Sequence, residues 1–446
     1  MSRLTARSRE LLLLVFATGL LLLMLFGLET SQGRTLSTEM LYIVGGFIGV
    51  YAIAHVAIAF LAPHADQVML PTVALLNAVG LVVIYRIDLA ERPGYGPLAE
   101  RQMLWSLVGV GLMVLTLIVV REHQALSRYS YLLGLVGLIL LALPLVWPQP
   151  EGTDARIWLW LGPFSIQPGE FSKILLLIFF AQLLAQKRAL FTVAGRRFLG
   201  FTFPRLRDLA PILMVWAIAI LIMAVSNDFG PALLLFATVL GMVYFATGRA
   251  SWLAIGLALV AIGGYAVYQV SSKIQERVAN FIDPFSDFEG IGNQPANALI
   301  SLSWGGVTGT GLGYGHPELV PVAHSDYILA AIGEELGFVG IAAVLCLFAV
   351  FITRGFRTAM QVRDTYGKLL ASGLALTLAI QIFVVAGGVS SMLPMTGLTT
   401  PFMSAGGSSV MANYILLGLL LRISNSANRS PEYDEATQRR EVVGAR

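Results

Sequence analysis

Long apolar runs alternate with short polar segments along almost the whole chain. Each run holds about 20 residues, the length that a helix needs to cross a hydrocarbon core of about 30 Å. A backbone in lipid must satisfy its own hydrogen bonds, so runs rich in Leu, Val, Ile, Ala and Gly are predicted to be helices. Twelve spans are expected at residues 10–28, 40–62, 68–86, 103–120, 129–147, 170–187, 209–226, 229–247, 251–270, 327–353, 367–388 and 408–424. The pattern predicts an all-α, polytopic transmembrane helical bundle forming one domain over residues 1–424.

The composition agrees with a chain whose surroundings are mostly lipid. Apolar residues make up 57% of it and charged residues 12%, whereas about a quarter of a soluble domain is charged. The single cysteine, Cys346, lies in an apolar run, so a disulfide within one chain is excluded. Arginines precede the first run, as in a secretory signal, but the run is longer than a signal's apolar core and no clear cleavage site follows. We interpret it as a retained signal anchor.

The distribution of Lys and Arg predicts the orientation. With the N-terminus inside, the inner segments hold 21 of the 29 basic residues and the outer segments hold 8. Cytoplasmic loops are enriched in Lys and Arg, so both termini are expected in the cytoplasm. The outer Arg86, Arg92 and Arg101 oppose this trend. The mixed-charge segment 425–446 is expected to be a disordered cytoplasmic tail.

Two outer segments, 148–169 and 271–326, are longer than ordinary connections, and such loops are usually functional. In the second, Gly290 and Gly292 would hold Asp287 in a defined turn. Asp287 belongs either to a solvated acidic loop or to a site where its carboxylate is a general base or holds a divalent cation. The glycine-rich stretch SWGGVTGTGLGYG lacks the features of a nucleotide-binding loop and is predicted to form turns.

Several charged residues lie within or beside the apolar runs. Glu170 and Lys173 share one face at a helix start, either as a local ion pair or, with Arg156, as a cationic site for an anionic head group. Glu334 and Glu335 fall inside a span, where carboxylates are costly and indicate pairing or function.

The remaining polar positions favour structural roles. Asp228 is expected to be a structural cap between two spans, and His55 and Gln381 are expected to form hydrogen bonds between helices. The Gly, Ser, Thr and Pro residues of 393–414 predict a re-entrant element or the floor of a cavity that is open to the outside. The five histidines show no metal-ligand spacing.

Four segments in order resemble the SEDS family, the FtsW/RodA/SpoVE-like proteins of cell-wall synthesis. RIWLWLGPFSIQPGEFSK is similar to R-x-W-x-x-x-G…Q-P-S-E-x-x-K, and DPFSDFEGIGNQPANALISLSWGGVTGTGLGYG resembles the family's large outer loop. HSDYILAAIGEELGFVG resembles H-T-D-F-I-F-A…E-E-L-G, and LPMTGLTTPFMSAGGSS is similar to L-P-x-T-G-x-x-x-P-F-x-S-Y-G-G-S-S. The resemblance implies a family core of ten spans plus two extra N-terminal spans at about residues 10–62.

The resemblance also implies a function and a site. It implies a glycosyltransferase that polymerises lipid II into peptidoglycan at the outer face of the bacterial cytoplasmic (inner) membrane. The expected partners are a class B penicillin-binding transpeptidase, lipid II, polyprenyl diphosphate and membrane lipid, with no nucleic acid. Asp287 falls on the proposed catalytic aspartate, as general base or as the ligand of a divalent cation (Mg or Mn), the one cofactor expected. The expected substrate-binding residues are Arg156, Glu170, Lys173, Lys273, Arg277, Gln294, Glu334, Glu335, Ser404 and Ser408.

Departures from the family pattern bear on substrate preference more than on reaction type. Phe288 is found where the family usually has Pro, and Asn293 and Ala405 are found where it has Tyr. Gly169 replaces the family's Ser. Two other functions stay open: a flippase for the lipid-linked precursor, and a scaffold that only holds the transpeptidase. Charges concentrated at the outer helix ends favour the enzyme, since transporters place binding sites near the membrane midplane.

Overall fold

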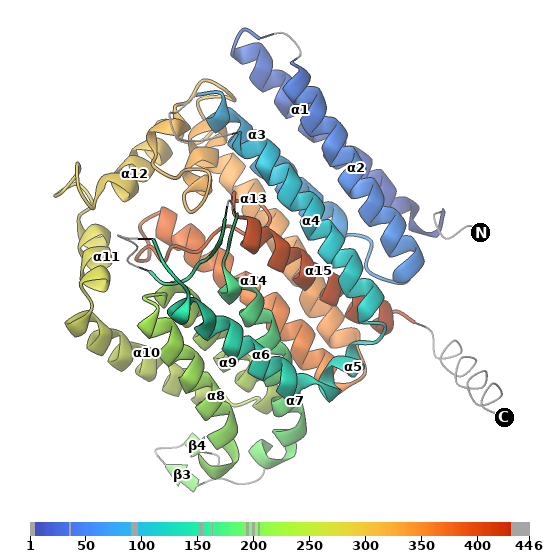
Figure 1. Cartoon of the computed structure of the whole chain (residues 1–446), viewed down its shortest axis with the longest axis vertical. Helices are drawn as coiled ribbons and strands as arrows, with labels where there is room; N and C mark the ends of the chain where they lie inside the picture. The colour runs from blue at the N-terminus through green and yellow to red at the C-terminus, as the bar shows by residue number, and fades with distance from the viewer. Residues whose placement is uncertain are drawn as a thin grey trace.

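The computed structural model describes residues 5–34, 37–90, 97–150, 155–162, 164–192, 196–198, 201–203 and 206–429 (Figure 1). Its long helices lie where the apolar runs predict them. They are α1 (Ser8–Ser31), α2 (Thr38–Leu61), α3 (Met69–Asp88), α4 (Leu98–Val119), α6 (Ser130–Val146), α7 (Pro168–Thr192), α8 (Leu206–Val225), α9 (Phe229–Thr247), α10 (Ser251–Val270), α13 (Ile328–Gln361), α14 (Thr365–Val389) and α15 (Gly407–Ala427). The predicted helical bundle is confirmed.

Within the described residues, ten of these helices are long and apolar enough to cross a membrane. Helix α6 is shorter, with 17 residues, and α8 has its side chains described only over Met214–Val225. The count of twelve spans and the placing of both termini in the cytoplasm therefore stay predictions.

The connections contain shorter elements. Three are helices, α5 (His123–Arg128), α11 (Ser272–Ile282) and α12 (Asn293–Gly305), and two are 3₁₀-helices, η1 (Thr5–Arg7) and η2 (Pro317–Leu319). Two antiparallel hairpins pair β1 (Leu159–Leu161) with β2 (Phe164–Ile166) and β3 (Arg196–Phe198) with β4 (Phe201–Phe203). An all-α prediction omits these hairpins, because strands of three residues are too short to show a period of two.

Helices α13 and α15 continue past the predicted ends of their spans. Helix α13 ends at Gln361 and not at 353, because the polar stretch RGFRTAMQ continues the helix after its apolar run ends. Helix α15 ends at Ala427, so the first residues of the predicted tail are helical. Residues 430–446 of that tail lie outside the described residues.

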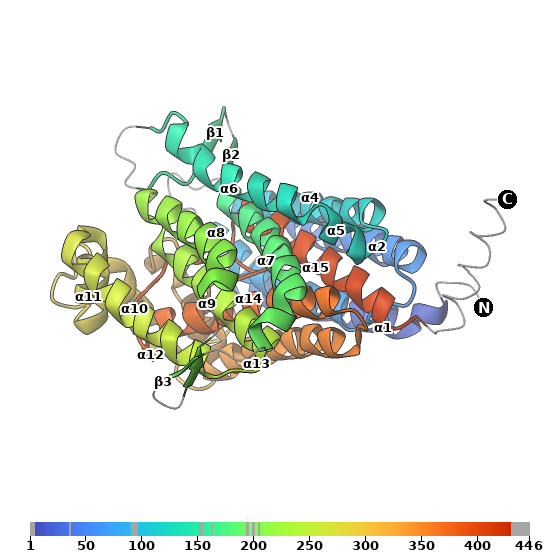
Figure 2. The ribbon, with the colours of Figure 1, turned by 90° about the horizontal axis from the view of Figure 1, so that it is seen from below.

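The helices form a layered bundle around α3 and α15, which are buried on almost every side. The hairpin of α1 and α2 packs on the outside of α3 and α4, whereas α10 exposes nearly its whole surface (Figure 1). The start of α1 and the end of α15 lie at one end of the bundle, and α11 and α12 lie at the opposite end (Figure 2). We call the end that carries α11 and α12 the outer end.

Helix α13 is broken at Gly337, whose φ of 68° is a left-handed conformation that favours glycine. The break leaves backbone groups of α13 without helical partners, and the glycine-rich loop 306–316 supplies partners for them. Thr310 N–H donates to the Glu334 carbonyl at 2.9 Å, and Phe338 N–H donates to the Gly306 carbonyl at 2.9 Å. Irregular backbone at membrane depth requires such pairing. Cys346 follows the break and is exposed on α13.

Candidate active site

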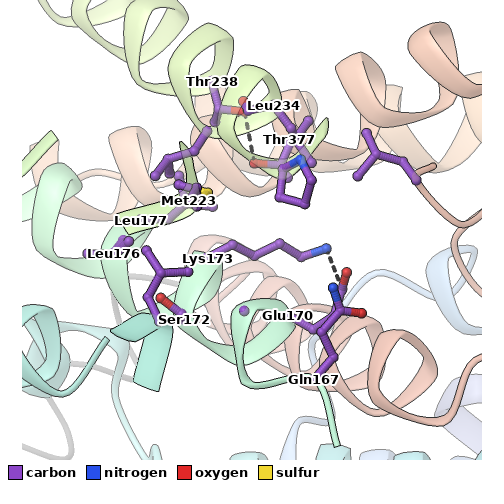
Figure 3. Close-up of a pocket in the computed structure, with 15 residues that line it drawn as sticks. Gln167, Glu170, Ser172, Lys173, Leu176, Leu177, Met223, Leu234, Thr238 and Thr377 are labelled. Atoms are coloured by element: carbon purple, nitrogen blue, oxygen red, sulfur yellow. Dashed lines mark hydrogen bonds and ion pairs between the residues drawn. The ribbon is translucent and has the colours of Figure 1, made fainter. Parts of the chain in front are cut away.

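The first turn of α7 places an ion pair at the outer end of the bundle. Pro168 begins the helix, where its missing N–H costs nothing, and Glu170 lies in the first turn, where the helix dipole favours a carboxylate. Lys173 Nζ lies 2.7 Å from Glu170 Oε2, so the prediction that these residues share a face is confirmed. Lys173 extends across a small cavity of about 20 Å³, roughly the room for one water molecule (Figure 3).

Helix α14 and the segment after it complete one wall around Lys173. Gln381 is fully buried, and its Nε2 donates to the Thr399 carbonyl at 2.8 Å. Its Oε1 accepts from Lys173 Nζ at 3.4 Å. The expected interhelical role of Gln381 is confirmed, and it directs an acceptor at the lysine.

The turn between α8 and α9 brings a second carboxylate to this place. Asp228 is the residue before α9, but its side chain forms no capping hydrogen bond. Burial raises the pKa of Asp228 to about 6, with a further rise from Glu170, against the opposing effect of Lys273 and Arg277. The prediction that Asp228 is a structural cap is therefore wrong with respect to its side chain.

Helix α11 contributes two cations, one bound to this turn and one bound to the segment after α14. Lys273 Nζ donates to the Asn227 carbonyl at 3.3 Å, and Arg277 Nη1 donates to the Thr396 carbonyl at 3.1 Å. Burial lowers the pKa of Arg277, while Asp228 and Asp326 favour its charged form. Burial likewise raises the pKa of Asp326. We call Glu170, Lys173, Asp228, Lys273, Arg277 and Asp326 the outer charged cluster.

Asp287 lies on the connection between α11 and α12, exposed to solvent. Its Oδ2 accepts from Ile291 N–H at 3.2 Å, and its carbonyl accepts from the N–H groups of Gly290 and Gly292 at 3.2 and 3.1 Å. The predicted turn around Asp287 is present. Gln294 follows on the exposed start of α12. Asp287 thus follows the helix that carries Lys273 and Arg277, and Gln294 lies at the start of the next helix.

Glu334 and Glu335 hold the glycine-rich loop. Glu334 Oε1 accepts from His316 N–H at 2.5 Å, and its Oε2 accepts from the Ser301 hydroxyl of α12. Glu335 Oε2 accepts from Gly313 N–H at 2.5 Å. Their carboxylates bind backbone and helix α12, so the contacts seen are structural.

Arg86 of α3 is the cationic partner of Glu335. Its Nε donates to Glu335 Oε1 at 3.2 Å, and its Nη2 donates to the Gly315 carbonyl at 2.6 Å. Glu318 Oε2 lies 3.5 Å from the same guanidinium. Arg86 is one of the outer arginines that oppose the predicted distribution of basic residues. Its pairing with Glu335 explains why an arginine is found there.

The other predicted binding residues lie around these groups. Arg156 has an exposed side chain, and its backbone N–H donates to the Ser226 carbonyl at 3.2 Å. Ser404 Oγ donates to the Ser325 carbonyl at 2.7 Å, and Ser408 Oγ accepts from Gln167 N–H at 2.9 Å. The two serines therefore fix the backbone of 393–414 and of the segment before α7.

The structure thus gathers four of the predicted residues, Glu170, Lys173, Lys273 and Arg277, into one cluster. It adds Asp228 and Asp326 to the cluster, which sequence reasoning missed as site residues. Arg86, also missed, holds Glu335 and the glycine-rich loop instead. A signal existed for Asp228, since it is a lone carboxylate in a very short connection between two apolar runs. Asp326 and Arg86 depend on contacts between helices far apart in the sequence.

Among the described residues, no group of three or more His, Cys, Asp or Glu side chains could hold a metal ion. A single carboxylate such as Asp287 can still bind Mg²⁺ together with a substrate, because Mg²⁺ is commonly held by one or two carboxylates and by substrate phosphates. The exposed carboxylate is compatible with an ion that a diphosphate brings with it.

A larger apolar cavity of about 670 Å³ lies between α12, α13 and α14. Hydrophobic side chains make most of its wall, and exposed Phe338, Phe383 and Met392 stand at its border. Such a surface suits hydrocarbon, whether a prenyl chain, a membrane lipid or a partner helix.

Comparisons with known proteins agree with this architecture. Residues 66–429 match the family model FtsW/RodA/SpoVE, described as cell cycle protein. The chain is 48% identical over 430 residues to the peptidoglycan glycosyltransferase RodA of Mycobacterium tuberculosis, covering 95% of this chain and 92% of that protein. It is 30% identical to the stage V sporulation protein E of Bacillus subtilis, covering 80% and 96%.

A solved structure is similar in fold. It is described as structural coordination of polymerization and crosslinking by a peptidoglycan synthase complex. The two chains superimpose with a TM-score of 0.65 and are 27% identical, and the match covers 82% of this chain and 99% of that chain.

Proposed function

Because the chain belongs to the FtsW/RodA/SpoVE family of cell cycle proteins, which makes it a multi-pass membrane protein, we propose that it is a peptidoglycan glycosyltransferase. It polymerises lipid II at the outer face of the bacterial cytoplasmic membrane. The substrate class follows from the relative's name and from the need for a lipid-embedded enzyme to take a lipid-linked donor.

The observation that carries the proposal is the outer charged cluster, part of which lies on α11, the helix that leads into the connection with the exposed Asp287. Lys173, Lys273 and Arg277 are the cations of this cluster, and the diphosphate of a lipid-linked sugar would lie against them. Cations placed where negative charge develops stabilise a transition state.

The reaction uses these groups in one displacement. The hydroxyl oxygen of the acceptor sugar attacks the anomeric carbon of the donor, and Asp287 accepts the hydroxyl proton. The bond between that carbon and the diphosphate oxygen breaks, and its electron pair leaves with the polyprenyl diphosphate. Lys173, Lys273, Arg277 and the exposed Arg156 are the cations proposed to stabilise this leaving group.

A divalent cation, Mg²⁺ or Mn²⁺, is proposed at Asp287. When bound, it would neutralise charge on the diphosphate. Asp287 would hold it together with substrate oxygens.

The proposed partner is a class B penicillin-binding transpeptidase. The solved structure of a peptidoglycan synthase complex, which couples polymerization to crosslinking, supports this choice. Membrane lipid would cover the apolar outside of the bundle.

Reconstitution in lipid nanodiscs tests the function. The purified chain, with and without its transpeptidase, is given fluorescent lipid II, and the products are separated by size. We expect glycan strands, in greater amount with the partner. Transbilayer movement of lipid II in vesicles, with no polymer formed under either condition, would instead establish a flippase and overturn the proposal.

A further inference from the structure

The hairpin of α1 and α2 reaches the glycine-rich loop 306–316 at the outer end of the bundle. The family match begins at residue 66, after both helices have ended. In Figure 1 the hairpin lies along α3, on the side of the bundle away from α10. Its outer turn nevertheless contacts a loop 281 residues later in the chain.

Three residues in the last turn of α1 and directly after it, Leu28, Ser31 and Gln32, lie against Gly313. Gln32 Nε2 donates to the Gly313 carbonyl at 2.5 Å. A Cβ at position 313 would lie 2.0 Å from Ser31 Oγ and 3.1 Å from Leu28 Cδ1. The spacing of 28, 31 and 32 puts these side chains on one face. Gly313 is buried, and its φ of 85° also favours glycine. The close approach therefore requires glycine on both counts.

Helix α3 joins the same two parts through neighbouring residues. Tyr85 OH donates to Glu29 Oε1 of α1 at 2.6 Å. Arg86 turns to the loop and binds Glu335 and the Gly315 carbonyl. Adjacent residues of α3 therefore bind the hairpin, through Tyr85, and the loop, through Arg86.

The loop transmits this contact toward the connection that carries Asp287. Glu335 binds Gly313 N–H, and the adjacent Glu334 binds Ser301 of α12. Helix α12 begins directly after the turn that contains Asp287. A shift of Gly313 would loosen the seat of α12 on α13.

We propose that the α1–α2 hairpin is a brace that fixes loop 306–316, with Gln32 as a positioning residue that acts through Gly313. The brace holds the loop in the one arrangement that seats α12. The effect of the brace on catalysis depends on the proposed role of Asp287. The effect of the brace on loop 306–316 does not depend on that role.

The test compares Gln32→Glu with Thr30→Ala in the full chain in nanodiscs. Gln32→Glu keeps the size of the side chain, removes the N–H donor and puts a carboxylate against the Gly313 carbonyl, whereas Gln32→Ala removes the donor without adding a charge. Thr30 is one turn from Phe26 and donates to the Phe26 carbonyl within α1, which makes its variant the matched control. We expect hydrogen exchange at the amides of residues 310–314 to accelerate about two- to ten-fold in Gln32→Glu, the range that one net hydrogen bond corresponds to, and to stay unchanged in Thr30→Ala.

Polymerisation separates this inference from the proposed function. If the wild type polymerises lipid II, Gln32→Glu should lower kcat and leave KM unchanged, and Gln32→Ala should do the same. Unchanged exchange in loop 306–316 of both Gln32 variants overturns the brace, whatever the activity. If the wild type, given its partner, forms no polymer while exchange in loop 306–316 is still accelerated in the Gln32 variants, the brace is supported. That result overturns only the glycosyltransferase assignment.

Discussion

Arg86 Nε lies 3.2 Å from Glu335 Oε1, and both side chains are almost fully buried. This ion pair joins α3 to the break in α13 and orders the loop that covers the break. Two charges so far from water stabilise a fold only when each keeps its partner. The pair therefore makes a strong prediction for single substitutions.

Arg86→Ala should lower the free energy of unfolding by about 3–5 kcal/mol, because it leaves Glu335 buried without its cation. Denaturant titration in detergent measures this. Arg354→Ala is the control: its contact with Asp66 at 3.4 Å involves a side chain that is 32% exposed, and such pairs contribute about 0–1 kcal/mol. Equal losses in the two variants would contradict the structural role of the Arg86 pair.

Asp287→Asn should lower the rate of lipid II polymerisation by about 10²–10⁴-fold, the usual contribution of a general base. Asp283→Asn is a matched control on the same exposed connection, since the Asp283 carboxylate accepts a local hydrogen bond from Phe285 N–H at 3.0 Å. Both variants should fold, because both carboxylates face solvent. A wild-type rate in folded Asp287→Asn would exclude this residue from catalysis.

Asp228 should make stability depend on pH. Its pKa is about 6 in the folded chain, above its ordinary value of 3.8, so the folded state binds the proton more tightly than the unfolded state. The stability it contributes is fully present below about pH 4 and is lost as the pH rises through about 6. Asp228→Asn should remove this part of the decline in Tm between pH 4.5 and 7.5. An identical decline in the wild type and the variant would show that Asp228 titrates normally.

Lys173→Met should abolish polymerisation and also destabilise the chain, because Glu170 then lies buried without its cation. Adding Glu170→Gln should restore the Tm, since the unpaired charge is gone, but should not restore polymerisation. Activity in the double variant near the wild-type level would mean that the pair serves the fold alone.

Removal of divalent cations tests the proposed ion at Asp287. EDTA should reduce polymerisation by the wild-type chain, and added Mg²⁺ or Mn²⁺ should restore it. Full activity in EDTA, with free metal below the micromolar range, would exclude the ion from the reaction.

The helices were predictable because apolar runs of fixed length leave the backbone few alternatives in lipid. Glu170 and Lys173 were also predictable as a pair, since three residues of helix put them on one face. The partner of Glu335 was not, because Arg86 is 249 residues away in the chain and only packing of α3 against α13 brings them together. The break at Gly337 was missed for a related reason: its freed backbone groups are paired by a loop from another part of the chain.

Cys346 gives the chain a native attachment point for a spectroscopic reporter. A thiol-specific spin label could react at one position only, because the sequence has no second cysteine, and that position lies on the outside of the bundle. The label would sit on the part of α13 that follows Gly337. Its spectrum in nanodiscs would therefore report the tilt and depth of that half-helix in the bilayer, without any engineered substitution.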